Sequence, residues 1–89
     1  MLKIKPTTKF KKDLKKADKS GWNIDKLTVV IETLVNQKQL DERHYDHKLT
    51  GNYIGCRDCH IESDWLLIYR IEDDYLVLLR TGTHSELFK

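Results

Sequence analysis

Histidines and carboxylates gather in the second half of this 89-residue chain. Asp58 and His60 stand two residues apart, so on a strand they share one face, where the carboxylate can fix the tautomer of the imidazole ring. Imidazole has a pKa of about 6.5 and can serve as a base or an acid at neutral pH, while an arginine can hold a phosphate through two hydrogen bonds. The residues of this candidate group are His47, Asp58, His60, Asp64, Arg80 and His84.

The chemistry that suits this group is proton transfer beside an anionic centre, and metal-independent cleavage of RNA matches it. In that reaction a base takes the proton of a 2′-hydroxyl, a cation stabilises the charge on the phosphate, and an acid protonates the departing 5′ oxygen. The sequence contains no phosphate-binding glycine loop, no serine elbow and no H-E-x-x-H zinc motif. The plainer interpretation is that these histidines are ordinary surface side chains.

Residues 56–60 match the C-x-x-C-H signature of haem attachment, and the two cysteines could also suggest zinc or redox chemistry. On an extended strand, residues three apart point to opposite faces, so Cys56 and Cys59 would diverge and could not easily share a disulfide or a metal ion. We therefore expect two reduced cysteines that pack as small apolar side chains, and we expect no metal and no cofactor.

The elements that must position these residues are predicted from the spacing of apolar side chains. Residues 2–5 alternate in polarity, which predicts a short strand, and residues 8–19 carry a narrow apolar stripe on a lysine-rich helix. A second helix with a broader apolar face is expected at residues 23–36, and the two helices should form an antiparallel hairpin. Three runs rich in aliphatic and aromatic residues then predict an antiparallel meander, at 52–61, 65–71 and 75–81.

This element order, β-α-α-β-β-β, predicts an α+β fold with an N-terminal strand, a helical hairpin and a three-stranded meander. The helices should cover one face of the sheet, which leaves the other face for function. The length fits one small domain, residues 1–89, without a linker or an internal repeat. No apolar stretch is long enough for a bilayer or a secretory signal, so we expect a cytoplasmic protein.

Charge is divided unevenly along the chain. Residues 1–19 carry eight lysines and two aspartates, a net charge of 8 − 2 = +6, whereas residues 20–89 carry eight basic and twelve acidic residues, a net charge of 8 − 12 = −4. A basic front of this kind predicts a surface that meets a polyanion, and the alternative is a lysine-rich helix that only needs a solvated face.

Three motifs, in this order, resemble the YafQ-type branch of the RelE/ParE toxin superfamily. They are D-H-x-L-x-G at 46–51, R-D-x-H-x-x-x-D-W at 57–65 and R-T-G-T-H-x-x-L-F at 80–88. The resemblance, which spans essentially the whole chain, implies a RelE-like toxin of a type II toxin–antitoxin system. Such a toxin is a small ribonuclease that enters the A site of the 70S ribosome, cuts mRNA there without a metal and inhibits translation. Its implied partners are a cognate antitoxin, mRNA and ribosomal RNA, with no membrane, and with operator DNA only through the antitoxin.

The resemblance also implies roles for the histidines. By matching position, His84 would be the general acid and Arg80 would hold the scissile phosphate. The general base would be His47 or His60, and both remain open.

Further site residues come from the same resemblance. Asp58 and Asp64 would orient imidazoles or the RNA, and Phe88 would stack on a base, unless its ring only closes the edge of the core. The lysines of the first helix would contact phosphates of ribosomal RNA in a sequence-independent, salt-sensitive way: Lys11, Lys12, Lys15, Lys16 and Lys19.

Two other functions stay open. One is a non-nuclease of the same fold that acts on a protein target, as ParE-type relatives act on gyrase, and the other is an inactive member of the nuclease family. ParE-type relatives lack the histidine group, so the presence of His47, His60 and His84 favours the nuclease.

Overall fold

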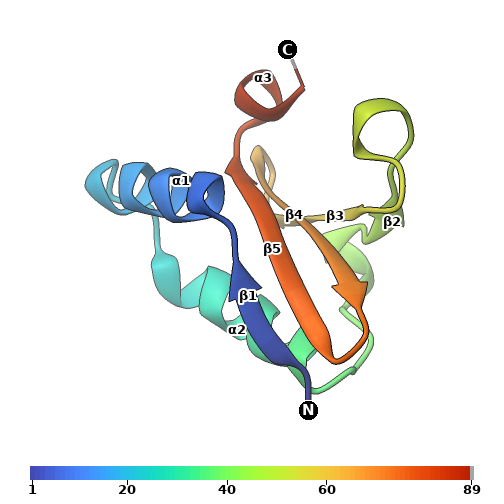
Figure 1. The fold of residues 1–89 in the computed structure, drawn as a ribbon. Coiled ribbons are helices and arrows are strands. Elements are labelled where there is room, and N and C mark those ends of the chain that lie inside the picture. Colours follow the sequence, from blue (N-terminus) through green and yellow to red (C-terminus); the bar gives the residue numbers. More distant parts are fainter. Residues whose placement is uncertain (89) are drawn as a thin grey trace.

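The computed structural model describes residues 1–88, in which a twisted sheet carries two long helices and several short elements (Figure 1). The long elements are β1 (Lys3–Pro6), α1 (Thr8–Lys19), α2 (Ile24–Val35), β3 (Arg57–Glu62), β4 (Trp65–Glu72) and β5 (Tyr75–Gly82). The short elements are the 3-10 turns η1 (Glu42–His44) and η2 (Gly51–Tyr53), the strand β2 (His47–Lys48) and the helix α3 (His84–Leu87). The expected element order is confirmed.

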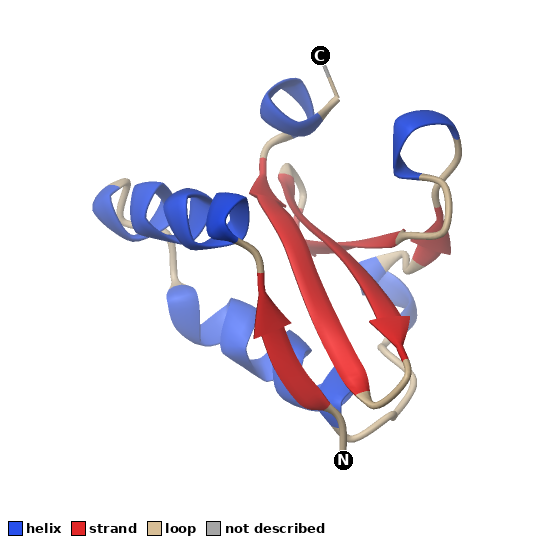
Figure 2. Cartoon of the chain, in the orientation of Figure 1, coloured by secondary structure: helices blue, strands red, loops and turns tan. Residues whose placement is uncertain are grey.

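The strands within residues 1–88 form one sheet in the order β1-β5-β4-β3-β2 (Figure 2). The pairs β5–β4, β4–β3 and β3–β2 are antiparallel, which confirms the meander. β1 runs parallel to β5, so the first and last strands of the chain lie side by side.

Each long helix begins where a side chain caps it. The Thr7 side chain accepts a hydrogen bond from the amide of Phe10, and the Asn23 side chain accepts one from the amide of Asp25. Such caps satisfy amides that have no partner inside the helix. The predicted helix positions are confirmed.

Both helices pack on one face of the sheet, as expected. Their apolar residues join those of β3, β4 and β5 in the main core, which includes Phe10, Leu27, Val30, Leu34, Leu67, Tyr69 and Leu78. A smaller cluster lies on the opposite face beneath η2 and α3, and contains Cys56, Leu66, Ile68 and Leu87. The opposite face is therefore partly covered, and the candidate site lies beside this smaller cluster.

The two consecutive helices form the expected antiparallel hairpin. Figure 1 shows them running in roughly opposite directions from the turn between them, with α1 beside β5 and α2 behind the sheet. Gly21 has a φ of 80°, which glycine adopts without strain.

The strand predicted at 52–61 begins later, at Arg57. Gly51 and Gly55 have φ values of 67° and 86°, which a strand does not accommodate, so residues 51–53 form a 3-10 turn instead. Residues 47–48, which lie outside the predicted strands, form the two-residue strand β2, which pairs His47 with Asp58.

β1 ends at Pro6, opposite Leu78, so the part of β5 that follows Leu78 has no neighbouring strand on that side. The Thr7 hydroxyl donates to the carbonyl of Leu79 over 2.8 Å, and the amide of Thr81 donates to Asp13 over 3.2 Å. α1 therefore satisfies polar groups that would otherwise offer an unpaired strand edge. None of the helices in residues 1–88 is long and apolar enough to cross a membrane.

Candidate active site

The register of the sheet aligns one row of side chains across four strands. Arg80 of β5 lies opposite Ile68 of β4, which lies opposite Asp58 of β3, which lies opposite His47 of β2. Residues opposite one another share a face, and neighbouring strands are about 4.8 Å apart. The row therefore lies on the face of Ile68, away from the long helices, with the backbones of Asp58 and Arg80 roughly 10 Å apart.

A β-bulge decides the direction of Arg80. Ile68 pairs with Arg80, but Tyr69 pairs with Leu78, so Leu79 is an extra residue in β5. Strict alternation would put Arg80 on the same face as Leu78, which packs in the main core beneath the helices. The bulge shifts this alternation and places Arg80 on the same face as Asp58.

Asp58 and His47 form a close pair at one end of the row. Asp58 is 3% exposed, and its Oδ1 lies 3.1 Å from Nδ1 of His47. Nδ1 of His47 also lies 2.9 Å from the carbonyl oxygen of Tyr45. A carbonyl only accepts hydrogen bonds, so Nδ1 donates its proton to it, and the lone pair of the neutral ring is on Nε2.

Burial raises the pKa of Asp58, although the charges of His47, His60 and His84 act to lower it. Among residues 1–88, Oδ1 of Asp58 has no partner with hydrogen-bond geometry. An unpaired buried carboxylate is costly, and a protonated histidine nearby offsets that cost. Burial is the largest of these effects, so the pKa of Asp58 lies above its usual range.

His84 and Asp64 form the second pair. Oδ1 of Asp64 accepts hydrogen bonds from the backbone amide of His84 over 3.0 Å and from its Nδ1 over 2.9 Å. These bonds lower the pKa of Asp64, so its carboxylate stays charged beside the ring. Nε2 of His84 is left to face a ligand.

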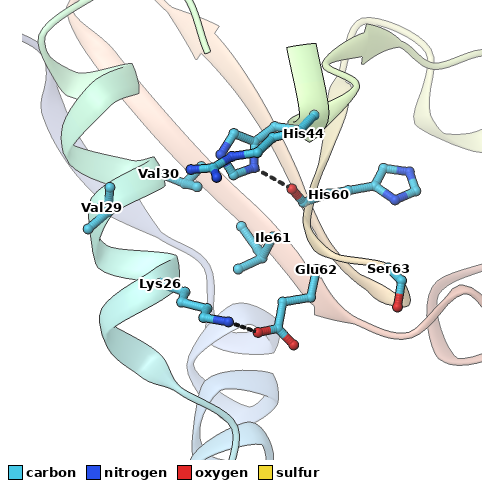
Figure 3. Close-up of a pocket in the computed structure, with 9 residues that line it drawn as sticks. Lys26, Val29, Val30, His44, His60, Ile61, Glu62 and Ser63 are labelled. Carbon is cyan, nitrogen blue, oxygen red and sulfur yellow. Dashed lines mark hydrogen bonds and ion pairs between the residues drawn. The ribbon is translucent and has the colours of Figure 1, made fainter. Parts of the chain in front are cut away.

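His60 lies between the two pairs. Its ring centre is 5.5 Å from that of His84 and 5.8 Å from that of Tyr45. Its backbone carbonyl accepts a 2.6 Å hydrogen bond from Nδ1 of His44. In Figure 3 this bond closes one side of a pocket of about 430 Å³ between α2, η1 and β3, and the His60 ring points away from that pocket.

Arg80 is held by Asp13 of α1. Its Nε donates to Oδ2 over 2.7 Å and its Nη2 donates to Oδ1 over 3.2 Å. The hydrogen bonds to Asp13 raise the pKa of Arg80, so the guanidinium remains a cation. A fork fixed on one side by a carboxylate can present its remaining N–H groups to a phosphate.

Phe88 lies at the end of the face next to His84. Its side chain is exposed, with its ring centre 6.2 Å from that of His84 and 5.7 Å from that of Tyr53. This position is compatible with a stacked base and with closure of the core edge, so its role stays a prediction.

The predicted RNA-binding lysines lie on the outer surface of α1. Lys16 differs from the others because it pairs with Glu86 of α3. The exposed lysines are Lys11, Lys12, Lys15, Lys16 and Lys19. Their contact with RNA stays a prediction.

The two cysteines point to different sides of the sheet, as the two-residue period of a strand predicts. Cys56 packs in the small cluster, Cys59 packs in the main core, and both are free and buried. The two thiols therefore lie on opposite faces of the sheet.

The family model of a bacterial toxin of a type II toxin–antitoxin system, YafQ, matches residues 2–89. The chain belongs to this YafQ family. The resemblance drawn from the three motifs is thus confirmed.

Relatives support the membership in the YafQ family. The mRNA interferase toxin YafQ of Escherichia coli K12 is 40% identical over 86 residues, which cover 96% of this chain and 94% of that protein. A toxin from Helicobacter pylori, solved as a copper-bound mutant, has a TM-score of 0.95 and 43% identity, covering 99% of this chain and 100% of that one. In the E. coli DinJ–YafQ complex, the matching chain has a TM-score of 0.91 and 38% identity, with 100% coverage of both chains.

The copper-bound relative raises the question of metal ligands in this YafQ-family chain. In the part of the chain that the structure describes, residues 1–88, no group of three or more His, Cys, Asp or Glu side chains is placed to hold a metal ion.

The sequence reasoning missed Asp13, and it included Asp46 in the first motif without assigning it a partner. Asp13 holds Arg80, and Asp46 accepts hydrogen bonds from Nε of Arg57 over 3.1 Å and from the hydroxyl of Tyr69 over 2.6 Å. Asp46 thereby ties the segment that precedes His47 to the sheet. The available signal for Asp13 was its position on the apolar stripe of α1, three residues after Phe10, where a carboxylate needs a partner.

We predict that Asp13→Ala destabilises the protein by about 1–3 kcal/mol, because it removes the acceptor of Arg80 and of the Thr81 amide. The matched control is Asp18→Ala, which removes an exposed carboxylate from the same helix and should change stability by less than about 0.5 kcal/mol. Urea denaturation measures both values. Equal stability of the two variants would contradict the assigned role of Asp13.

We also predict a pH-dependent stability difference between Asp58→Asn and the wild type. The folded-state pKa of Asp58 is raised, so its stabilising contribution is present below the unfolded-state pKa and is lost as the pH rises through the folded-state pKa. Asparagine cannot ionise, so the variant should gain stability relative to the wild type as the pH rises above about 4. Thermal denaturation from pH 3 to pH 8 measures this difference. A relative loss of stability over that range would show that the histidines outweigh burial.

Proposed function

We propose that this chain is a toxin that cuts mRNA in the A site of the ribosome by histidine-based acid–base catalysis, without a metal, and so inhibits translation. Its membership in the YafQ family and the relatives named mRNA interferase toxin make it an endoribonuclease. The observation that carries the mechanism is the pairing of His47 and His84 with carboxylates on the same face of the sheet as Arg80.

The general base in this mechanism is His47. Its Nδ1 proton is committed to the carbonyl of Tyr45, so the lone pair on Nε2 can take the proton of the 2′-hydroxyl. The imidazolium that forms is stabilised by Asp58, 3.1 Å away. His60 remains the alternative base, because its ring lies on the same face between the two pairs.

The general acid is His84. Its Nδ1 donates to the carboxylate of Asp64, which orients the ring, and Nε2 of the protonated ring supplies the proton for the departing 5′ oxygen. The 2′-oxygen forms a bond to phosphorus as the bond to the 5′ oxygen breaks, which leaves a 2′,3′-cyclic phosphate and a 5′-hydroxyl. Arg80 stabilises the charge on the non-bridging oxygens.

The partners follow from the proposed substrate and the family. The E. coli YafQ chain is solved in complex with DinJ, and we infer that a cognate antitoxin binds and blocks this toxin in the same way. The lysines of α1 contact ribosomal RNA, which places the protein in the cytoplasm. Operator DNA is contacted only through the antitoxin.

We predict that His84→Ala loses about 10²–10⁴-fold in cleavage rate, because general acid catalysis contributes a factor of this size. The measurement compares growth and mRNA 5′ ends after induction of the wild type and the variant in a bacterial host. His84 is exposed, so the variant should melt at the same temperature as the wild type. Equal toxicity of the two proteins would contradict the acid role, and a toxic wild type without new mRNA ends would favour a non-nuclease.

We predict that replacing Lys12 and Lys15 by glutamate weakens ribosome binding. The salt dependence of binding should also fall, because fewer phosphate contacts release fewer counterions. The control pair, Lys3 and Lys38, is exposed and lies outside α1. Ribosome pelleting at several salt concentrations measures both pairs. Equal binding of the two double variants would remove the role of the α1 lysines.

A further inference from the structure

The face that carries the catalytic residues also carries a continuous run of aromatic rings. Each ring in the run lies within 4.7–6.2 Å of the next, measured between ring centres. Phe88 stands near the His84 end, and a tyrosine stands at the His47 end. In order, the rings are those of Tyr53, Phe88, His84, His60, Tyr45 and His47.

Tyr45 is the ring of this run next to the proposed base His47, and the mechanism does not use its side chain. Its side chain is 65% exposed, although its ring lies 4.7 Å from that of His47 and 5.8 Å from that of His60. A large aromatic ring left in solvent between two histidines has an open face for a ligand.

Neighbouring contacts hold the backbone of Tyr45 in an unusual conformation. Tyr45 has a φ of 45° and a ψ of 53°, a left-handed conformation that is unfavourable for a bulky residue. Its amide donates to the carbonyl of Glu42, its carbonyl accepts from His47, and the adjacent Asp46 is tied to Arg57. Strained backbone that neighbouring contacts maintain is typical of functional sites.

We propose that Tyr45 is a nucleobase-stacking residue of the RNA site and that it binds the base of the nucleotide whose 2′-hydroxyl is deprotonated. This proposal rests on the proposed function, because the position of Tyr45 beside His47 selects that nucleotide. Every base can stack on an aromatic face, so Tyr45 increases affinity and positions the RNA strand in the site without selecting its sequence.

Two variants of Tyr45 separate the contribution of its ring from that of its hydroxyl and its backbone. Tyr45→Ala removes the ring, and Tyr45→Phe keeps it and removes only the hydroxyl. The matched control is Tyr75→Ala, because Tyr75 is also a partly exposed tyrosine and begins β5, at the end of the strand remote from α3 (Figure 1). Melting temperatures check that each variant folds.

The experiment is single-turnover cleavage of mRNA on programmed 70S ribosomes, at increasing toxin concentration. Tyr45→Ala should raise the half-saturating concentration about 5- to 160-fold, which is the stacking energy of one base converted at 1.36 kcal/mol per tenfold change. The maximal rate should change little, and Tyr45→Phe and Tyr75→Ala should behave as the wild type.

A second substrate carries an abasic site at the nucleotide that supplies the 2′-hydroxyl. Loss of the base should weaken wild-type binding as much as Tyr45→Ala does, and the two changes together should cost no more than either alone. Fully additive losses would overturn the stacking role, as would a lower maximal rate at unchanged half-saturation, which would mean that the ring only positions His47. A wild type that cuts no mRNA would overturn the proposed function as well, whereas an active wild type matched by Tyr45→Ala would overturn only the role of Tyr45.

Discussion

The two-residue period of the strands, together with a bulge in β5, determines which side chains can meet. Asp58 and His60 share the face opposite the long helices because they are two residues apart in β3, while Cys59 packs in the core. In β5 the same period would direct Arg80 toward the helices, and the bulge at Leu79 reverses that direction. A carboxylate and an imidazole of β3 and a guanidinium of β5 therefore lie on one surface.

Aspartates from several elements hold basic side chains in the site and beside it. Each one constrains a side chain or segment that the sheet alone would leave mobile, and a catalytic group must be held close to its productive geometry. The cost is electrostatic, since burial disfavours the charged form of Asp58. The pairs are Asp13 with Arg80, Asp46 with Arg57, Asp58 with His47, and Asp64 with His84.

The sequence predicts the parts of this arrangement that follow from local periodicity. Helix positions, the meander and the divergence of Cys56 from Cys59 all depend on spacing within one element. The position of Asp13 on the apolar stripe of α1 indicates that it needs a partner, but the contact with Arg80 spans 67 residues, so local pattern does not identify that partner. The bulge at Leu79 lies in a run of ordinary aliphatic residues, and local pattern carries no signal for it. The motifs that resemble the family identify the histidines, but their hydrogen-bond partners depend on how the strands align.

The central claim is that His47 and His84 act on opposite sides of the scissile phosphate. It is tested most directly with mRNA in which sulfur replaces the bridging 5′ oxygen at the cut, because a thiolate leaves without a general acid. Single-turnover cleavage on ribosomes should show that the sulfur substrate restores His84→Ala close to the wild-type rate and leaves His47→Ala slow. A His84→Ala variant that stays slow on the sulfur substrate, or a His47→Ala variant that is restored by it, would contradict the account.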